Sequence, residues 1–183
     1  MTEIVIDFKL EKQKIEEIVP QNLTQWLKKS VSVIQKDTPF DAYSSDMSIA
    51  DIGKLKKKIE ARVTKEIMDQ QLIDTETFLC GLYVSNLLGK MVTELPESWF
   101  LIDYVEKFND FGNPYILKEA GDMCFLLCGA FCGKEKIPYY QNSGAVLYKN
   151  FYEYTKIEIG LLMSQHFDSM TQVASRCFTK FGS

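Results

Sequence analysis

The segment from Asp74 to about Thr93 constrains the fold most, because apolar residues lie on nearly every side of the helix that it predicts. These residues are Phe78, Leu79, Leu82, Val84, Leu87, Leu88 and Met91. Other elements surround a helix that is apolar all round, so this one is predicted to be central, with Asp74 as its N-cap. Gly81, Ser85 and Gly89 recur at every fourth position. Because glycine in a helix interior costs about 1 kcal/mol relative to alanine, this stripe predicts a groove in which another backbone packs closely.

Helical periodicity continues on both sides of this segment. From Ser48, with Asp51 at capping-box spacing, apolar residues fall in one narrow arc and lysines fill most of the remainder. The arc consists of Ile49, Ile52, Ile59, Val63 and Ile67. Further helices are predicted from Pro96 to about Phe108, from Asn113 to Gly133, from Pro138 onwards, and from about Ile157 to Phe178.

The N-terminal part has a different pattern. Residues 4–10 place large apolar side chains at every second position, which is typical of a short strand. Residues 11–34 predict two short helices, followed by a polar loop. We therefore predict an all-α fold, a single-domain bundle of about six to seven helices with room for one short N-terminal strand. Residues 1–183 form one domain in this interpretation, with residues 1–45 as an N-terminal arm and residues 48–180 as the helical core.

Composition and charge narrow the class of protein. The 183 residues are 46% hydrophobic and 25% charged, with a net charge of −4, which indicates a globular domain with a sizeable core and argues against a nucleic-acid binder. The longest apolar stretch, Met123–Gly133, is shorter than the ~20 residues of a transmembrane helix, and no signal sequence is visible. The five cysteines lie mostly in apolar runs. Their number and setting are typical of reduced thiols and predict a cytoplasmic protein.

Three cysteines are spaced for one side of a helix. Cys124, Cys128 and Cys132 occupy every fourth position, so their sulfurs form a slanted stripe that a soft metal could use. Zinc sites usually combine two close cysteine pairs, which this chain lacks. Cysteine is also a small core residue, and Gly129 and Ala130 beside it are small too. Tight helix packing is therefore the favoured interpretation, and no metal or other cofactor is predicted.

Glu119 is a carboxylate in an apolar setting. On its predicted helix it falls between Leu126 and Ala130, whereas Lys118 and Asp122 form an i,i+4 pair on the more polar side. A buried carboxylate needs a partner. The candidate partners are Tyr139, Tyr140, Tyr148, His166 and Arg176. A structural polar network is favoured here over catalysis.

His166 is the only histidine, and it falls on the apolar face of the last predicted helix. A histidine there is at least half-buried and requires a hydrogen-bond partner. A single histidine excludes a histidine-rich zinc site within one chain and the paired Glu-x-x-His arrangement of di-iron bundles. No phosphate-binding loop, dinucleotide fingerprint or nucleophile elbow is present in the sequence. An enzyme is therefore the less favoured class.

The C-terminal half resembles a group of small bacterial all-helical proteins of uncharacterised activity. The pattern is a Leu-x-Glu-x-Gly-Asp helix, an apolar segment that ends in Gly-x-Phe, a Tyr-Tyr pair, a small residue and a tyrosine-containing turn. The matching positions are Leu117, Glu119, Gly121, Asp122, Gly129, Phe131, Tyr139, Tyr140, Gly144 and Tyr148. The likeness covers about residues 75–180. It implies an all-α fold and a bacterial, cytosolic protein, and it implies no activity.

These observations favour a non-enzymatic protein that acts by association. Helices that are apolar on more than one side, 13% aromatic residues and a strand-like arm predict a surface that another chain covers. The partner is a second copy in a homodimer or a different protein. The alternative is a helical pocket for a hydrophobic or haem-like small ligand. The residues assigned either to such a site or to a buried polar network are Glu119, Asp122, Tyr139, Tyr140 and His166.

Overall fold

The computed structural model describes residues 49–72, 74–91, 94, 96–131 and 138–178. This part of the chain contains seven α-helices and one short π-helix, and it contains no strand, which confirms the all-α prediction. The helices are α3 (Ile49–Asp69), α4 (Thr75–Met91), α5 (Leu101–Phe111), α6 (Tyr115–Leu126), η1 (Leu127–Phe131), α7 (Pro138–Thr155), α8 (Glu158–Gln165) and α9 (Phe167–Phe178). The predicted strand, the N-terminal arm and Ser48 lie outside the described residues. No described helix has both the length and the apolar character needed to cross a membrane.

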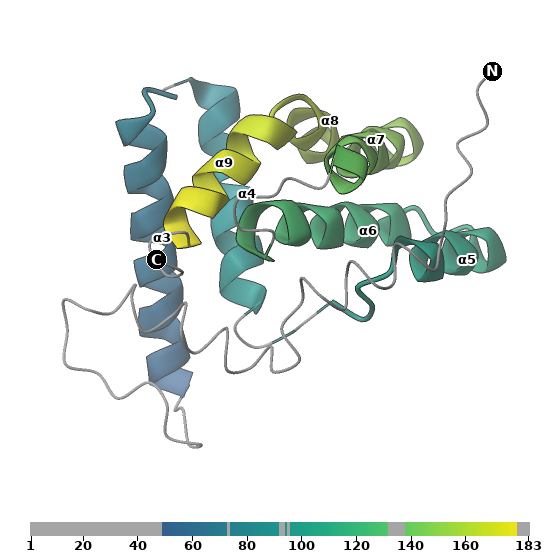
Figure 1. The fold of residues 1–183 in the computed structure, drawn as a ribbon, viewed down its shortest axis with the longest axis horizontal. Coiled ribbons are helices and arrows are strands. Elements are labelled where there is room, and N and C mark those ends of the chain that lie inside the picture. Colours follow the sequence, from purple (N-terminus) through teal and green to yellow (C-terminus); the bar gives the residue numbers. More distant parts are fainter. Residues whose placement is uncertain (1–48, 73, 92–93, 95, 132–137, 179–183) are drawn as a thin grey trace.

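The helices pack around one shared core (Figure 1). α3 and α4 lie side by side, α6 packs between α5 and α7, and α9 crosses onto α3, α4 and η1. Large, fully buried side chains come from α4, α6, α7 and α9 and include Leu88, Phe125, Tyr148 and Phe167.

The α3–α4 pair confirms two predictions. Ile59, Val63 and Ile67 are buried, as expected for the apolar seam of α3. On α4, the stripe of small residues receives α3, because a Cβ added at Gly81 would lie 2.2 Å from the Cδ1 atom of Ile67. Asp74 caps α4 as predicted. Its Oδ1 accepts a hydrogen bond of 2.8 Å from the Thr77 amide, and its Oδ2 accepts one of 2.7 Å from the Thr77 hydroxyl.

The prediction that α4 is covered on every side is wrong. Phe78, Leu79 and Leu82 are 51%, 42% and 49% exposed. The helices that contact α4 most, α3, α8 and α9, pack against its other sides. One side of α4 therefore presents apolar side chains to solvent.

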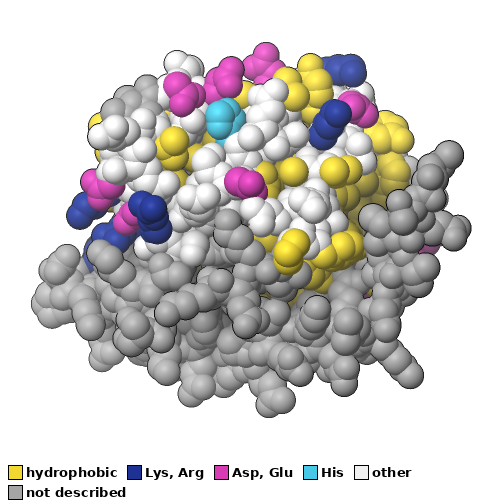
Figure 2. Space-filling view, turned by 45° about the horizontal axis from the view of Figure 1, so that its top comes forward, with side chains coloured by type: hydrophobic (Ala, Val, Ile, Leu, Met, Phe, Trp, Pro, Cys, Tyr) yellow, Lys and Arg dark blue, Asp and Glu magenta, His cyan; other side chains and the backbone are white. Residues whose placement is uncertain are grey.

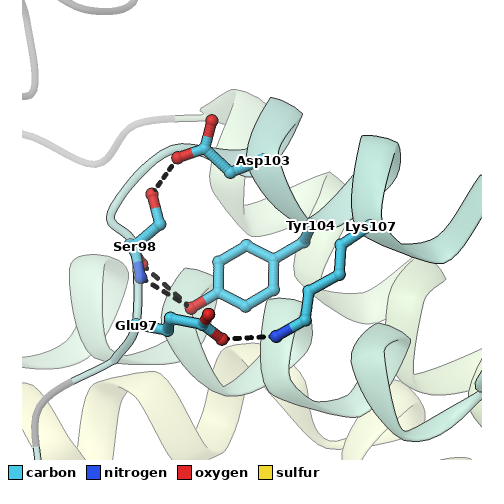
Figure 3. Close-up of polar contacts among 5 residues, drawn as sticks. All are labelled: Glu97, Ser98, Asp103, Tyr104 and Lys107. Carbon is cyan, nitrogen blue, oxygen red and sulfur yellow. Dashed lines mark hydrogen bonds and ion pairs between the residues drawn. The ribbon is translucent and has the colours of Figure 1, made fainter. Parts of the chain in front are cut away.

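The helix predicted from Pro96 begins later, at Leu101. Side chains hold the preceding segment in an extended turn (Figure 3). The Tyr104 hydroxyl donates to the Ser98 carbonyl at 3.0 Å and accepts from the Ser98 amide at 3.3 Å. The Ser98 hydroxyl donates to Asp103, and Lys107 pairs with Glu97. These bonds satisfy Ser98 outside a helix, so the chain becomes helical only after it.

Two helices predicted as continuous are divided. The segment that follows Pro114 changes from α to π geometry at Leu127. The last predicted helix is interrupted at His166, whose backbone has φ −102° and ψ 13°. After the interruption the partners change: α8 packs mainly on α7 and α4, whereas α9 packs mainly on η1 and α3 and less on α4 and α7.

Candidate functional site

A pocket of about 210 Å³ lies between the C-terminal half of α4, the segment before α5, and α6. Its lining residues are Leu87, Lys90, Met91, Glu94, Pro96, Glu97, Tyr104, Glu119, Asp122, Met123 and Leu126. The sequence analysis singled out two of these, Glu119 and Asp122. The wall combines apolar side chains with four carboxylates and one lysine, which is the mixture of surfaces typical of a small-ligand site.

Asp122 is the centre of a hydrogen-bond network that joins three helices. Its Oδ1 accepts a hydrogen bond of 2.6 Å from the hydroxyl of Tyr148 on α7 and another from the hydroxyl of Tyr83 on α4. Its Oδ2 accepts a hydrogen bond of 2.8 Å from the Nζ of Lys118, which lies one turn earlier on α6. The predicted i,i+4 pair is therefore present, and it is only 27% and 14% exposed at its two side chains. Both carboxylate oxygens are engaged by donors from the protein itself.

Burial and charge keep the two tyrosines in their neutral, donating form. Tyr148 is 1% exposed, and desolvation followed by the negative charge of Asp122 raises its pKa well above the usual range. The same two causes, in the same order, raise the pKa of Tyr83 well above its usual range. The Asp122 carboxylate thus accepts bonds from two hydroxyls and an ammonium group, and these bonds join α4, α6 and α7.

Glu119 does not have the buried setting predicted for it. Its side chain is exposed, and it lines the open side of the pocket. Leu126, two turns further along α6, is 2% exposed and lines the same pocket. Both residues share a helix face as the sequence indicates, but that face is buried at Leu126 and exposed at Glu119. Because Glu119 is exposed, its carboxylate does not need the hydrogen-bond partners that were expected for a buried side chain.

The other predicted site residues lie elsewhere, and none of them lines the pocket. His166 Nε2 lies 3.3 Å from Glu76 Oε2 at the start of α4, and the His166 side chain is 25% exposed. Figure 2 shows this histidine at the surface of the molecule. Tyr139 and Tyr140 open α7, where Tyr140 is buried and their ring centroids are 5.2 Å apart. The structure thus separates His166 and the tyrosine pair from the Asp122 network.

The cysteine stripe follows the packing interpretation as far as it is described. Cys124 is buried and Cys128 is half-buried, while Cys132 lies outside the described residues. Cys128 lies in the π segment η1, whereas Cys124 lies in α6. A Cβ added at Gly129 would lie 2.8 Å from the Cβ of Ala174, so α9 packs closely here. In the described ranges, no group of three or more His, Cys, Asp or Glu side chains could hold a metal ion.

Two tyrosines are among the site residues that sequence reasoning missed: Tyr83 in the Asp122 network and Tyr104 in the pocket wall. Tyr83 was hidden because it is 39 residues from Asp122 and lies on a helix that is otherwise read as apolar. A signal was present, since a tyrosine on a mostly buried helix requires a partner for its hydroxyl. Tyr104 carried the same signal.

Comparisons of the chain with protein-family models, with curated proteins and with solved structures found no match. The resemblance to small bacterial helical proteins stays a prediction.

Proposed function

We propose that this chain is a non-enzymatic association module that pairs with a second copy of itself through the exposed side of α4. One observation carries the proposal: Phe78, Leu79 and Leu82 present large apolar side chains to solvent on a helix whose opposite side is buried in the core. Phe78 and Leu82 are spaced i,i+4 and therefore lie next to each other on the helix surface.

Among the described residues, the α4 face is a stronger candidate than a second exposed apolar region, on α5, α6 and α7. The other region includes Phe111, Tyr115 and Tyr154, which are 74%, 51% and 66% exposed. Figure 2 shows hydrophobic side chains gathered on the right of that view, the side of α5 and α7 in Figure 1. Two of these three residues are tyrosines, whose hydroxyls remain hydrated at a free surface. The side chains of the α4 face have no polar atom, and complete burial of each contributes roughly 1.5–3 kcal/mol.

A two-fold arrangement uses this patch twice. In a symmetric dimer, one surface of each copy contacts the same surface of the other copy. The row of apolar side chains on α4 can therefore form the centre of the contact by packing against its equivalent. The pocket chemistry fits a non-enzymatic role, since both oxygens of Asp122 are bound by the protein's own donors.

The test is the molar mass in solution over a concentration series, measured by light scattering after size exclusion. We expect a dimer for the native chain and a monomer for the Phe78→Ser/Leu82→Ser variant, with far-UV circular dichroism unchanged. The matched control is Phe111→Ser, which removes a more exposed aromatic side chain on α5 and should leave the dimer intact. A native chain that is monomeric at all concentrations would contradict the proposal. Loss of the dimer in the control alone would also contradict it.

The pocket supports a second candidate function, the binding of a small hydrophobic ligand. Its volume of about 210 Å³ is below the ~300–1,000 Å³ of sites for drug-sized ligands. A haem-like ligand held by His166 is not supported, because that residue does not line the pocket. Native mass spectrometry tests this function: an extra mass of a small organic molecule, lost on denaturation, would support it.

A further inference from the structure

The charges around the pocket balance except at one residue. Four carboxylates line it, and three of them have a lysine partner. Lys90 lies 3.0 Å from Glu94, Lys118 lies 2.8 Å from Asp122, and Lys107 pairs with Glu97. Within the described residues, Glu119 has no hydrogen-bond or ion-pair partner. Lys90 and Lys107 also interact electrostatically with Glu119, but each of them forms its ion pair with another carboxylate. Among the described residues, Glu119 is therefore the one pocket carboxylate without an ion-pair partner of its own.

The inner wall of the pocket is apolar. Met91, Met123 and Leu126 line it and are 3%, 0% and 2% exposed. Methionine side chains adapt to the shape of what they contact. This wall suits a short alkyl chain and provides no hydrogen-bonding group of its own.

The Tyr104 hydroxyl contributes little to the recognition of polar groups on a ligand. Its hydroxyl both donates to and accepts from the backbone of Ser98 (Figure 3), so its hydrogen-bonding capacity toward a ligand is largely used. Glu97, at the edge of the pocket, pairs with Lys107 across the same turn. Glu119 is thus the group that remains to select a ligand by charge.

We propose that the pocket binds a small organic monocation, a primary alkylammonium ion of a few carbons. The ammonium pairs with the Glu119 carboxylate and the alkyl chain lies along Met91, Met123 and Leu126. This inference rests on the second candidate function, small-ligand binding at the same pocket. It differs from that function in specifying one positive charge. It excludes an anionic ligand, because the lysines near the pocket already pair with carboxylates.

The experiment is an amide-resolved NMR titration of the full chain at neutral pH with three ligands of matched shape: pentan-1-amine, pentan-1-ol and pentanoate. We expect the amine to shift the amide signals of the lining residues and to bind about fivefold more tightly than the alcohol, the size of effect that one partly exposed ion pair produces. Pentanoate should bind more weakly than the alcohol. Glu119→Gln should remove the preference for the amine and leave the affinity for the alcohol unchanged.

The matched control is Glu106→Gln, which removes an exposed carboxylate of α5 that does not line the pocket. It should keep the full preference. If amine and alcohol bind equally, or if the Glu119 variant keeps the preference, the proposed charge selection is wrong although the pocket binds ligands. If no ligand shifts the amide signals of the lining residues, the monocation inference is overturned. If native mass spectrometry also finds no bound mass, small-ligand binding at this pocket is overturned as well.

Discussion

Replacing Asp122 by alanine removes the acceptor of two tyrosine hydroxyls and one ammonium group at the same time. A hydrogen bond to an ionised group contributes roughly 1.5–3 kcal/mol to stability, so the two tyrosine bonds together account for about 3–6 kcal/mol. The ion pair with Lys118, whose side chains are 27% and 14% exposed, is not included in this range. Since small domains are stable by only about 5–15 kcal/mol, Asp122→Ala should lose a large share of the total stability.

Urea denaturation followed by circular dichroism measures this loss. Asp122→Asn is the isosteric comparison: it keeps a carbonyl acceptor for the hydroxyls but removes the charge, so it should cost less than the alanine variant. The m-value should remain unchanged in both variants, which shows that the transition still reports unfolding of the whole domain.

A double-mutant cycle with Tyr148→Phe tests the cause. The Tyr148 hydroxyl is buried, so in the alanine variant it is left without its ionised acceptor, and deleting it should recover part of the lost stability. This follows because an unsatisfied buried donor costs more than the absence of both partners. If the two single changes are additive, the Asp122–Tyr148 bond does not carry the effect and the reasoning is refuted.

Packing and titration give three further predictions. Gly160→Ala should destabilise the protein by about 1–3 kcal/mol through overpacking, because the added Cβ would lie 2.8 Å from a backbone oxygen of α7. Gly53→Ala should instead stabilise α3 by up to about 1 kcal/mol, because an added Cβ there would have nothing within 4 Å. Thermal unfolding of both variants checks this, and equal shifts of the unfolding temperature would contradict it. Burial raises the pKa of Cys80, Cys177 and Tyr104 to about 12. The unfolded chain releases these protons at lower pH, so stability should be fully present below the ordinary thiol pKa of 9.0 and fall as pH rises toward about 12, by up to about 1.4 kcal/mol per pH unit for each group. Urea midpoints that stay constant across this alkaline range would contradict the assignment. The same two thiols should react with a thiol reagent only as fast as the domain opens, which labelling followed by mass spectrometry can measure.

The features predicted correctly depend on residues close together in sequence. The Asp74 cap, the apolar seam of α3 and the Lys118–Asp122 pair are set by spacings of three or four residues. A helical projection describes such spacings well because helix geometry is nearly invariant over a few turns. The small-residue stripe of α4 was also predictable, since glycine in a helix interior needs a packing reason.

The features that were missed depend on how the helices are placed relative to one another. Glu119 lies on a largely buried helix, yet its side chain is exposed beside a pocket, and a helical projection does not show where the packing against a face ends. The contact between Tyr83 and Asp122 spans 39 residues, and no local spacing encodes it. The change to π geometry at Leu127 and the interruption at His166 reorient whole helices. No proline or glycine stands at or next to His166, and the π segment begins two residues before Gly129.

The position of α9 has a consequence for how the chain folds during synthesis. Met170, Val173 and Ala174 are completely buried, and they come from a helix that packs on α3, α4 and η1. The ribosome makes α9 after all of these partners, so a nascent chain without residues 167–178 leaves their apolar faces uncovered. Such a chain exposes the kind of surface that chaperones bind and that aggregates when it is not protected. Folding to the native core is therefore completed only after α9 has left the ribosome, and truncation before Phe167 should yield a chain that accumulates with chaperones instead of a smaller stable domain.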